Sequence, residues 1–163
     1  MIIEAMTEPT ASLPACNGVA PLPHLGVIRA EGEDAARFLH GQLTQDFALL
    51  GPDAARLAAL CSPKGRMLAS FIGIKPSSTE VLLICPADVL AATVKRLSQF
   101  VLRAKLRLSD ASADFELRGL MGDALETVAK DDRLALGCRD FSSGKLIFMP
   151  SAPGLERAIW LAP

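Results

Sequence analysis

The order of strand-like and helix-like segments between residues 25 and 121 constrains this chain more than any other feature. An apolar run at 25–30 predicts a strand, and Glu33 with Asp34 then opens a helix whose apolar residues recur every three or four positions. Three strands, a second helix and two more strands are predicted to follow at 57–61, 67–74, 81–85, 86–101, 104–108 and 115–121. This order predicts an α+β fold, with helices on one face of a ferredoxin-like antiparallel sheet.

The same segments suggest a division of the chain into three parts. Residues 1–23 are rich in proline, so we expect a flexible leader. Residues 24–112 form the predicted ferredoxin-like lobe, and residues 113–163 form the start of a second α+β lobe. Because nothing continues the last predicted strand at 157–161, we expect the chain to be cut within that second lobe.

Composition predicts a globular protein and narrows its partners. Half of the residues are hydrophobic, and the formal net charge of −1 leaves no basic excess for a phosphate backbone. A loose basic stretch still allows a modest basic patch at Lys95, Arg96, Arg103, Lys105 and Arg107. We expect no direct nucleic acid partner, no membrane association and, without a recognisable export signal, a cytoplasmic location.

Cysteine and histidine residues give no sign of a metal site. The cysteines are too widely spaced for a CxxC-type ligand set, at Cys16, Cys61, Cys85 and Cys138. We interpret them as reduced thiols, with those in apolar runs buried and inert. The two histidines lie 16 positions apart, at His24 and His40, without a paired carboxylate motif, so no metal is predicted.

Two polar clusters are candidate binding features. Gln42 and Asp46 lie at the predicted end of the first helix, where polar side chains can cap carbonyls or face a cleft. Lys64 and Arg66 flank Gly65 in a tight turn, whose cations and backbone amides could hold a carboxylate or phosphate. A solvated helix end and a plain charged hairpin remain the alternatives, and no catalytic residue is predicted.

Two ordered motifs resemble a known superfamily. GEDAARFLHGQLTQD at 32–46 and CSPKGRMLASF at 61–71 are similar to the opening of the YgfZ-type folate-binding proteins and of the related aminomethyltransferases, the T-proteins of glycine cleavage. The resemblance covers roughly residues 24–122 and implies that the chain is the N-terminal portion of such a protein. It also implies an aminomethyltransferase-like folate-binding domain.

The resemblance separates two branches of the superfamily. T-proteins carry an acidic pair where this chain has Ala69 and Ser70, which indicates the YgfZ branch. That branch implies a folate-binding accessory protein that supports iron–sulfur cluster assembly or repair, and thereby tRNA modification. The implied cofactor is tetrahydrofolate or a derivative, and the implied partners are folate and iron–sulfur enzymes or assembly proteins. The candidate residues for the folate cleft are Gln42, Asp46, Lys64, Arg66 and Ser70.

This chain also departs from the YgfZ pattern. The branch has a later Lys-Gly-Cys-Tyr motif whose cysteine is its presumed working group, and Cys138 lies in no such sequence. Leu25 stands near the position where members of the branch use a tryptophan to contact folate. We therefore do not expect the fragment to be a competent enzyme by itself; any activity would be tetrahydrofolate-dependent one-carbon transfer.

Two other functions remain open. One is a divergent tetrahydrofolate-dependent aminomethyltransferase of the glycine-cleavage type, which would turn over a methylated amine. The other is a folate-independent interaction module on the same scaffold, since a fold does not determine a function.

Overall fold

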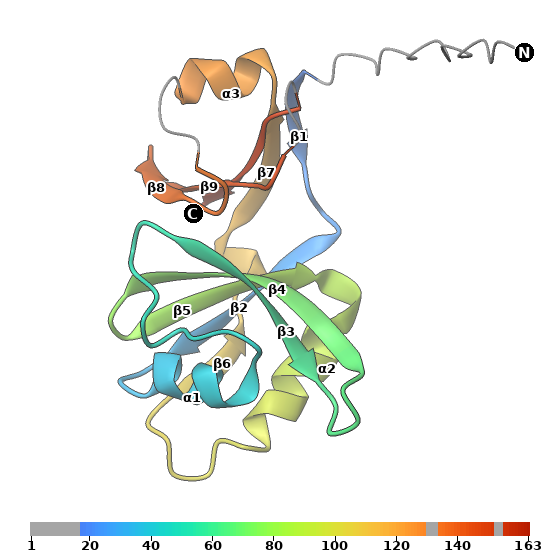
Figure 1. Ribbon diagram of the computed structural model, residues 1–163, viewed down its shortest axis with the longest axis vertical. Coiled ribbons are helices and arrows are strands. Elements are labelled where there is room, and N and C mark those ends of the chain that lie inside the picture. Colours follow the sequence, from blue (N-terminus) through green and yellow to red (C-terminus); the bar gives the residue numbers. More distant parts are fainter. Residues whose placement is uncertain (1–16, 130–133, 152–154) are drawn as a thin grey trace, which may run out of the picture.

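Two five-stranded antiparallel sheets form the body of the protein, stacked one above the other in Figure 1. The computed structural model describes residues 17–129, 134–151 and 155–163. All contacts below concern those residues.

The first sheet has the strand order β3-β4-β5-β2-β6. Its strands are β2 (Leu25–Glu31), β3 (Ala55–Cys61), β4 (Met67–Ser77), β5 (Glu80–Pro86) and β6 (Arg107–Asp110). Helices α1 (Ala35–Gln42) and α2 (Ala87–Ser98) lie on the face of this sheet that points away from the second sheet (Figure 1). The predicted α+β architecture is thus confirmed, with one strand more than a minimal ferredoxin-like sheet because β3, β4 and β5 form a meander.

The second sheet has the strand order β1-β7-β10-β9-β8. Its elements are β1 (Gly18–Pro21), β7 (Glu116–Met121), α3 (Asp123–Val128), β8 (Cys138–Phe141), β9 (Gly144–Phe148) and β10 (Arg157–Ala162). A 3₁₀ turn, η1 (Ser112–Asp114), leads from the first sheet into the second.

Strand β1 corrects one expectation and strand β8 adds an element that the sequence did not predict. Residues 18–21 belong to the predicted flexible leader, yet they pair in register with β7, because an extended proline-ended segment can serve as an edge strand. Residues 1–16 of the predicted leader lie outside the described residues. Strand β8 is short and half charged, so its sequence carries no clear alternation.

Two element boundaries also differ from the expectation. Strand β6 begins at Arg107, because the amide and carbonyl of Lys105 are engaged by Asp34 at the start of α1. Helix α1 ends at Gln42 instead of near Asp46. Thr44 leaves the helix to bond the edge of β3, where its amide donates to the Ala59 carbonyl at 3.0 Å.

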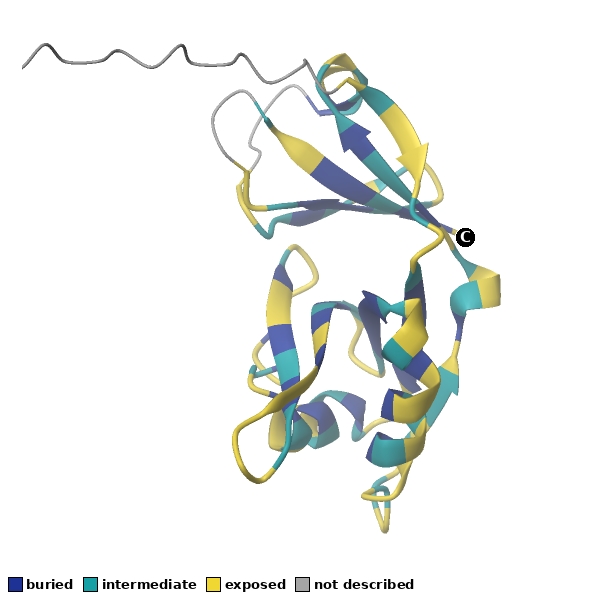
Figure 2. Ribbon diagram, turned by 90° about the vertical axis from the view of Figure 1, so that its right-hand side faces the viewer, coloured by how far each residue is buried: buried dark blue, intermediate teal, exposed yellow. Residues whose placement is uncertain are grey.

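The core is divided between the two faces of the first sheet. Residues such as Leu39, Phe71 and Leu97 pack between this sheet and its helices. A second cluster joins the two sheets, with Val27 and Ile84 facing a set of residues from the second sheet: Leu117, Cys138, Ile147, Ile159 and Leu161. Figure 2 shows the result along α2, where buried and exposed residues alternate in the manner of a helix with one covered side.

Two glycines permit close contacts that position the first helix and the loop after it. Gly32 has φ of +139°, and a Cβ at this position would lie 2.1 Å from the Lys105 carbonyl oxygen. At Gly73 on β4, a Cβ would lie 2.3 Å from the ring of Phe47, which is completely buried. The loop after α1 is therefore anchored on the sheet by an aromatic ring that needs a glycine beneath it.

Candidate functional site: the open face of β3 and β4

The half of the first sheet formed by β3 and β4 has one covered face and one open face. Ala69 and Phe71 point to the helices and are buried. Successive side chains of a strand alternate between faces, so Ser70 points the other way. We define the open face by Leu57 and Ala59 of β3 with Leu68, Ser70 and Ile72 of β4.

The open face is apolar apart from one hydroxyl group. The register places Leu57 opposite Ile72 and Ala59 opposite Ser70, so these four side chains form two adjacent cross-strand pairs. Leu57 is 47% exposed and Leu68 is 38% exposed, whereas Ile72 packs against the cluster between the two sheets. The result is a flat apolar strip that starts at the seam between the sheets and ends in solvent.

The β3–β4 turn adds two cations to the end of this strip. Lys64 and Arg66 are exposed, and neither forms an ion pair with any residue in the described part of the chain. The amides of Gly65 and Arg66 donate to the Ser62 carbonyl and hydroxyl, so the turn uses them itself. The two cationic side chains are left for an anion, with Arg66 about 13 Å along the strand from Ser70 at 3.3 Å per residue.

Of the five residues proposed from sequence, the structure brings together three, Lys64, Arg66 and Ser70, on one hairpin. The carboxylate of Asp46 accepts the amides of Ala48 and Leu49 at 2.8 and 3.1 Å, which commits it to its own turn. Gln42 lines a different groove, on the α1 side of the sheet. The assignment of all five to a folate cleft stays a prediction.

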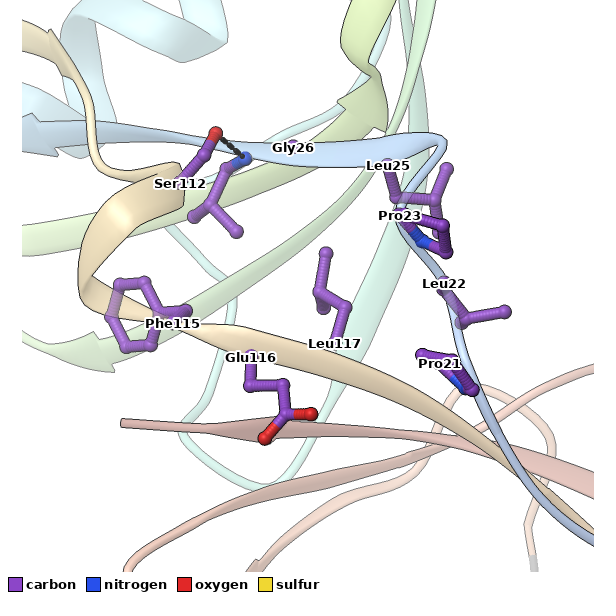
Figure 3. Close-up of a pocket in the computed structure, with 10 residues that line it drawn as sticks. Pro21, Leu22, Pro23, Leu25, Gly26, Ser112, Phe115, Glu116 and Leu117 are labelled. Carbon is purple, nitrogen blue, oxygen red and sulfur yellow. Dashed lines mark hydrogen bonds between the residues drawn. The ribbon is translucent and has the colours of Figure 1, made fainter.

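A separate hollow lies at the seam of the two sheets, under the connection from β1 to β2. It has a volume of about 320 Å³ and is lined by Pro21, Leu22, Pro23, Leu25, Gly26, Val27, Ser112, Phe115, Glu116 and Leu117. Figure 3 shows Leu117 in its middle and the Ser112 hydroxyl accepting the Val27 amide, at 3.0 Å. Glu116 pairs with Arg118 at 2.7 Å, which lowers the pKa of its carboxyl.

This hollow was not predicted from the sequence, because its lining comes from two segments about 90 residues apart. Leu25 nevertheless lies in it, near the position where the YgfZ resemblance would place a tryptophan. The polar groups named above already have partners, so the hollow presents mainly aliphatic and proline surface.

The buried thiols fit a structural role. Burial raises the pKa of Cys85 and of Cys138 to about 11, so both are protonated at neutral pH. Cys61 is half-buried, at the end of β3, and Cys16 lies outside the described residues. Within those residues, no three His, Cys, Asp or Glu side chains come together as metal ligands. The described part also contains no helix long and apolar enough to cross a membrane.

Comparison with known proteins identifies relatives of this chain. The chain is 30% identical over 162 residues to a mitochondrial iron–sulfur cluster assembly factor IBA57 homolog of Phaeosphaeria nodorum, an alignment that covers 93% of this chain and 37% of that protein. It is 29% identical to the tRNA-modifying protein YgfZ of Hamiltonella defensa, over 80% of this chain and 39% of the other. The homologues of this chain thus include YgfZ, IBA57 and aminomethyltransferase proteins.

A solved structure supports the fold of this superfamily. The glycine cleavage aminomethyltransferase T of Bartonella henselae superposes with a TM-score of 0.74 over 89% of this chain and 41% of that chain, at 18% identity. No protein-family model matches the chain. The chain spans roughly a third of the length of the curated relatives that head the comparison, between 28% and 39%.

Proposed function

We propose that this chain is a YgfZ-like, folate-binding accessory protein that supports iron–sulfur cluster assembly or repair, and through it tRNA modification. The observation that carries the proposal is the alignment with an iron–sulfur cluster assembly factor homolog over 93% of the chain. The YgfZ alignment, with a protein named as tRNA-modifying, supports the same function. Iron–sulfur enzymes or assembly proteins in the cytoplasm are the proposed partners.

The open face suits a folate. Ligand sites are mostly apolar with a few placed polar groups, and folates combine flat rings with a carboxylate-bearing tail. We infer that the rings lie on the strip formed by Leu57, Ile72 and Ala59, beside the Ser70 hydroxyl. Lys64 and Arg66 are then placed to attract the carboxylates of the tail.

The residues at the centre of this face argue against methyl transfer. The T-protein branch carries acids at the positions of Ala69 and Ser70. Here Ala69 is buried in the cluster between the sheet and its helices, and a serine hydroxyl cannot accept a proton from an amine as a carboxylate does. The role we assign to these residues is to bind and orient the folate; a tetrahydrofolate would itself supply one-carbon chemistry.

The binding proposal is tested by calorimetric titration of the full-length protein with 5-formyltetrahydrofolate. We expect saturable binding, weakened about tenfold, or about 1.4 kcal/mol, by Leu57→Glu, because a carboxylate on the strip must be desolvated under the rings. Val19→Glu is the matched control, since Val19 is a similarly exposed aliphatic residue on β1. Absence of binding, or an equal loss of affinity in both variants, would refute the site.

A divergent aminomethyltransferase is the second candidate. It is favoured by alignments with aminomethyltransferases, one of them 27% identical over 69% of this chain. It predicts tetrahydrofolate-dependent release of a one-carbon unit from a methylated amine. Folate binding without such turnover supports the accessory role, and a protein that recovers cluster-assembly partners but binds no folate is an interaction module.

A further inference from the structure

A groove on the outer side of α1 is independent of the open face. Its volume is about 380 Å³, and it is lined by Asp34, Arg37, Phe38, Gly41, Gln42, Arg103 and Ala104. These residues come from α1 and from the segment 99–106, which connects α2 to β6 and runs past α1 in Figure 1. The groove therefore lies on the helix side of the first sheet, opposite Ser70.

The groove is positively charged although the whole chain is not. Arg37 and Arg103 line it from two different elements, and neither has an ion-pair partner within the described residues. The one carboxylate of the lining, Asp34, accepts the Lys105 amide at 2.8 Å. Two guanidinium groups against one carboxylate leave a net positive charge.

The segment that supplies one wall of the groove has further cations nearby in sequence. Residues 89–109 contain no aspartate or glutamate, and their cations are Lys95, Arg96, Arg103, Lys105 and Arg107. Of these, Lys105 pairs with Glu33 at 2.6 Å. This is the loose basic stretch seen in the sequence, and it ends beside α1.

Apolar side chains accompany the cations. Phe38 and Ala104 contribute to the lining, and the connecting segment exposes 50% of Phe100 and 86% of Leu102. A surface that exists only to be solvated does not need an exposed phenylalanine and leucine within three residues of the unpaired Arg103. Aromatic residues and arginine are instead enriched where proteins bind each other.

We propose that this groove docks an acidic segment of a partner protein, with carboxylates on Arg37 and Arg103 and an apolar side chain against Phe38. Charge complementarity and the apolar neighbours select this occupant. A nucleic acid would need a longer row of cations to neutralise its phosphates and gains nothing from the aliphatic Leu102. The inference holds whether or not the open face binds folate.

Fluorescence polarisation tests this docking site in the full-length protein. The probe is a short labelled peptide of glutamate, leucine and phenylalanine, and the control peptide has lysine in place of glutamate. We expect only the acidic peptide to bind, with an affinity that falls as salt is added. Arg37→Ser with Arg103→Ser should weaken binding about tenfold, since two exposed ion pairs together contribute about 1.4 kcal/mol.

A charge-matched variant isolates the groove. Arg56→Ser with Arg157→Ser removes the same two charges from strands β3 and β10, outside the lining, and should bind the acidic peptide nearly as tightly as the unchanged protein. Circular dichroism melting confirms that both double variants fold. An equal loss of affinity for the acidic peptide in both double variants, or binding of the lysine peptide, overturns the proposal. Binding of a short single-stranded RNA that displaces the peptide, with equal sensitivity to Arg37 and Arg103, assigns the groove to nucleic acid instead.

Discussion

The two faces of strand β4 differ sharply in their surroundings. Ala69 and Phe71 are buried between the sheet and its helices, whereas Ser70 and Leu68, one position away, are on the open face. The residues of the 61–71 motif are thus divided between a face that packs in the core and a face that meets solvent. The difference teaches that adjacent positions of one motif can have opposite environments, since Ala69 belongs to the core and Ser70 meets solvent.

The largest expected effect is a loss of stability from a substitution on the helix-covered face of the first sheet. Phe47→Ala empties the niche above Gly73 and should lower the free energy of unfolding by about 4 kcal/mol, as buried phenylalanine truncations do. Leu49→Ala is the control two residues away, because Leu49 is almost fully exposed and should change stability by less than about 0.5 kcal/mol. Chemical denaturation measures both, and similar values for the two would show that the loop after α1 is not anchored by the ring.

A smaller loss of stability is expected from a substitution at Gly32, just before α1. Gly32→Ala introduces a Cβ that overlaps the Lys105 carbonyl, in a backbone conformation with positive φ. We expect the free energy of unfolding to fall by about 3 kcal/mol, because the backbone is strained and the hydrogen bonds between these segments are weakened. Gly41→Ala provides the contrast, since nothing lies within 4 Å of its added Cβ, and should stabilise the helix by about 0.5 kcal/mol. A thermal melt in which Gly32→Ala is neutral would contradict the close contact.

The smallest effect involves thiol reactivity without any loss of stability. In a Cys16→Ser background, only Cys61 should react with a thiol reagent at pH 8. Cys85 and Cys138 are buried with pKa values of about 11, so roughly one in a thousand is ionised at that pH. Their reaction should require unfolding or strongly alkaline solution. Fast modification of Cys138 in the native protein would reopen a redox role for it.

Much of the fold was predictable because its signals are local. The apolar run of β2, the three- and four-residue spacing in α1 and α2, and the turn residues of the meander are each readable within a short window. The boundary errors arose where a distant partner intervened, as when Asp34 engages the backbone of Lys105 and delays the start of β6.

The candidate site was less predictable, because side chains near in sequence diverge in space. Gln42 and Asp46 are four residues apart, yet one lines the groove beside Arg37 and the other caps its own turn. Neither assignment can be read from residue type, since a carboxylate in a loop can bind a ligand or its own backbone equally well.

By itself the sequence determined the α+β class, the order of elements and the superfamily, because hydrophobic periodicity and motif order survive without coordinates. Only the tertiary structure decided which motif residues share a surface. It paired β1 with β7, turned Ser70 away from α1, and brought Arg103 beside Arg37 across 66 positions of sequence. Such contacts depend on how sheets and helices pack, and packing is a property of the whole chain.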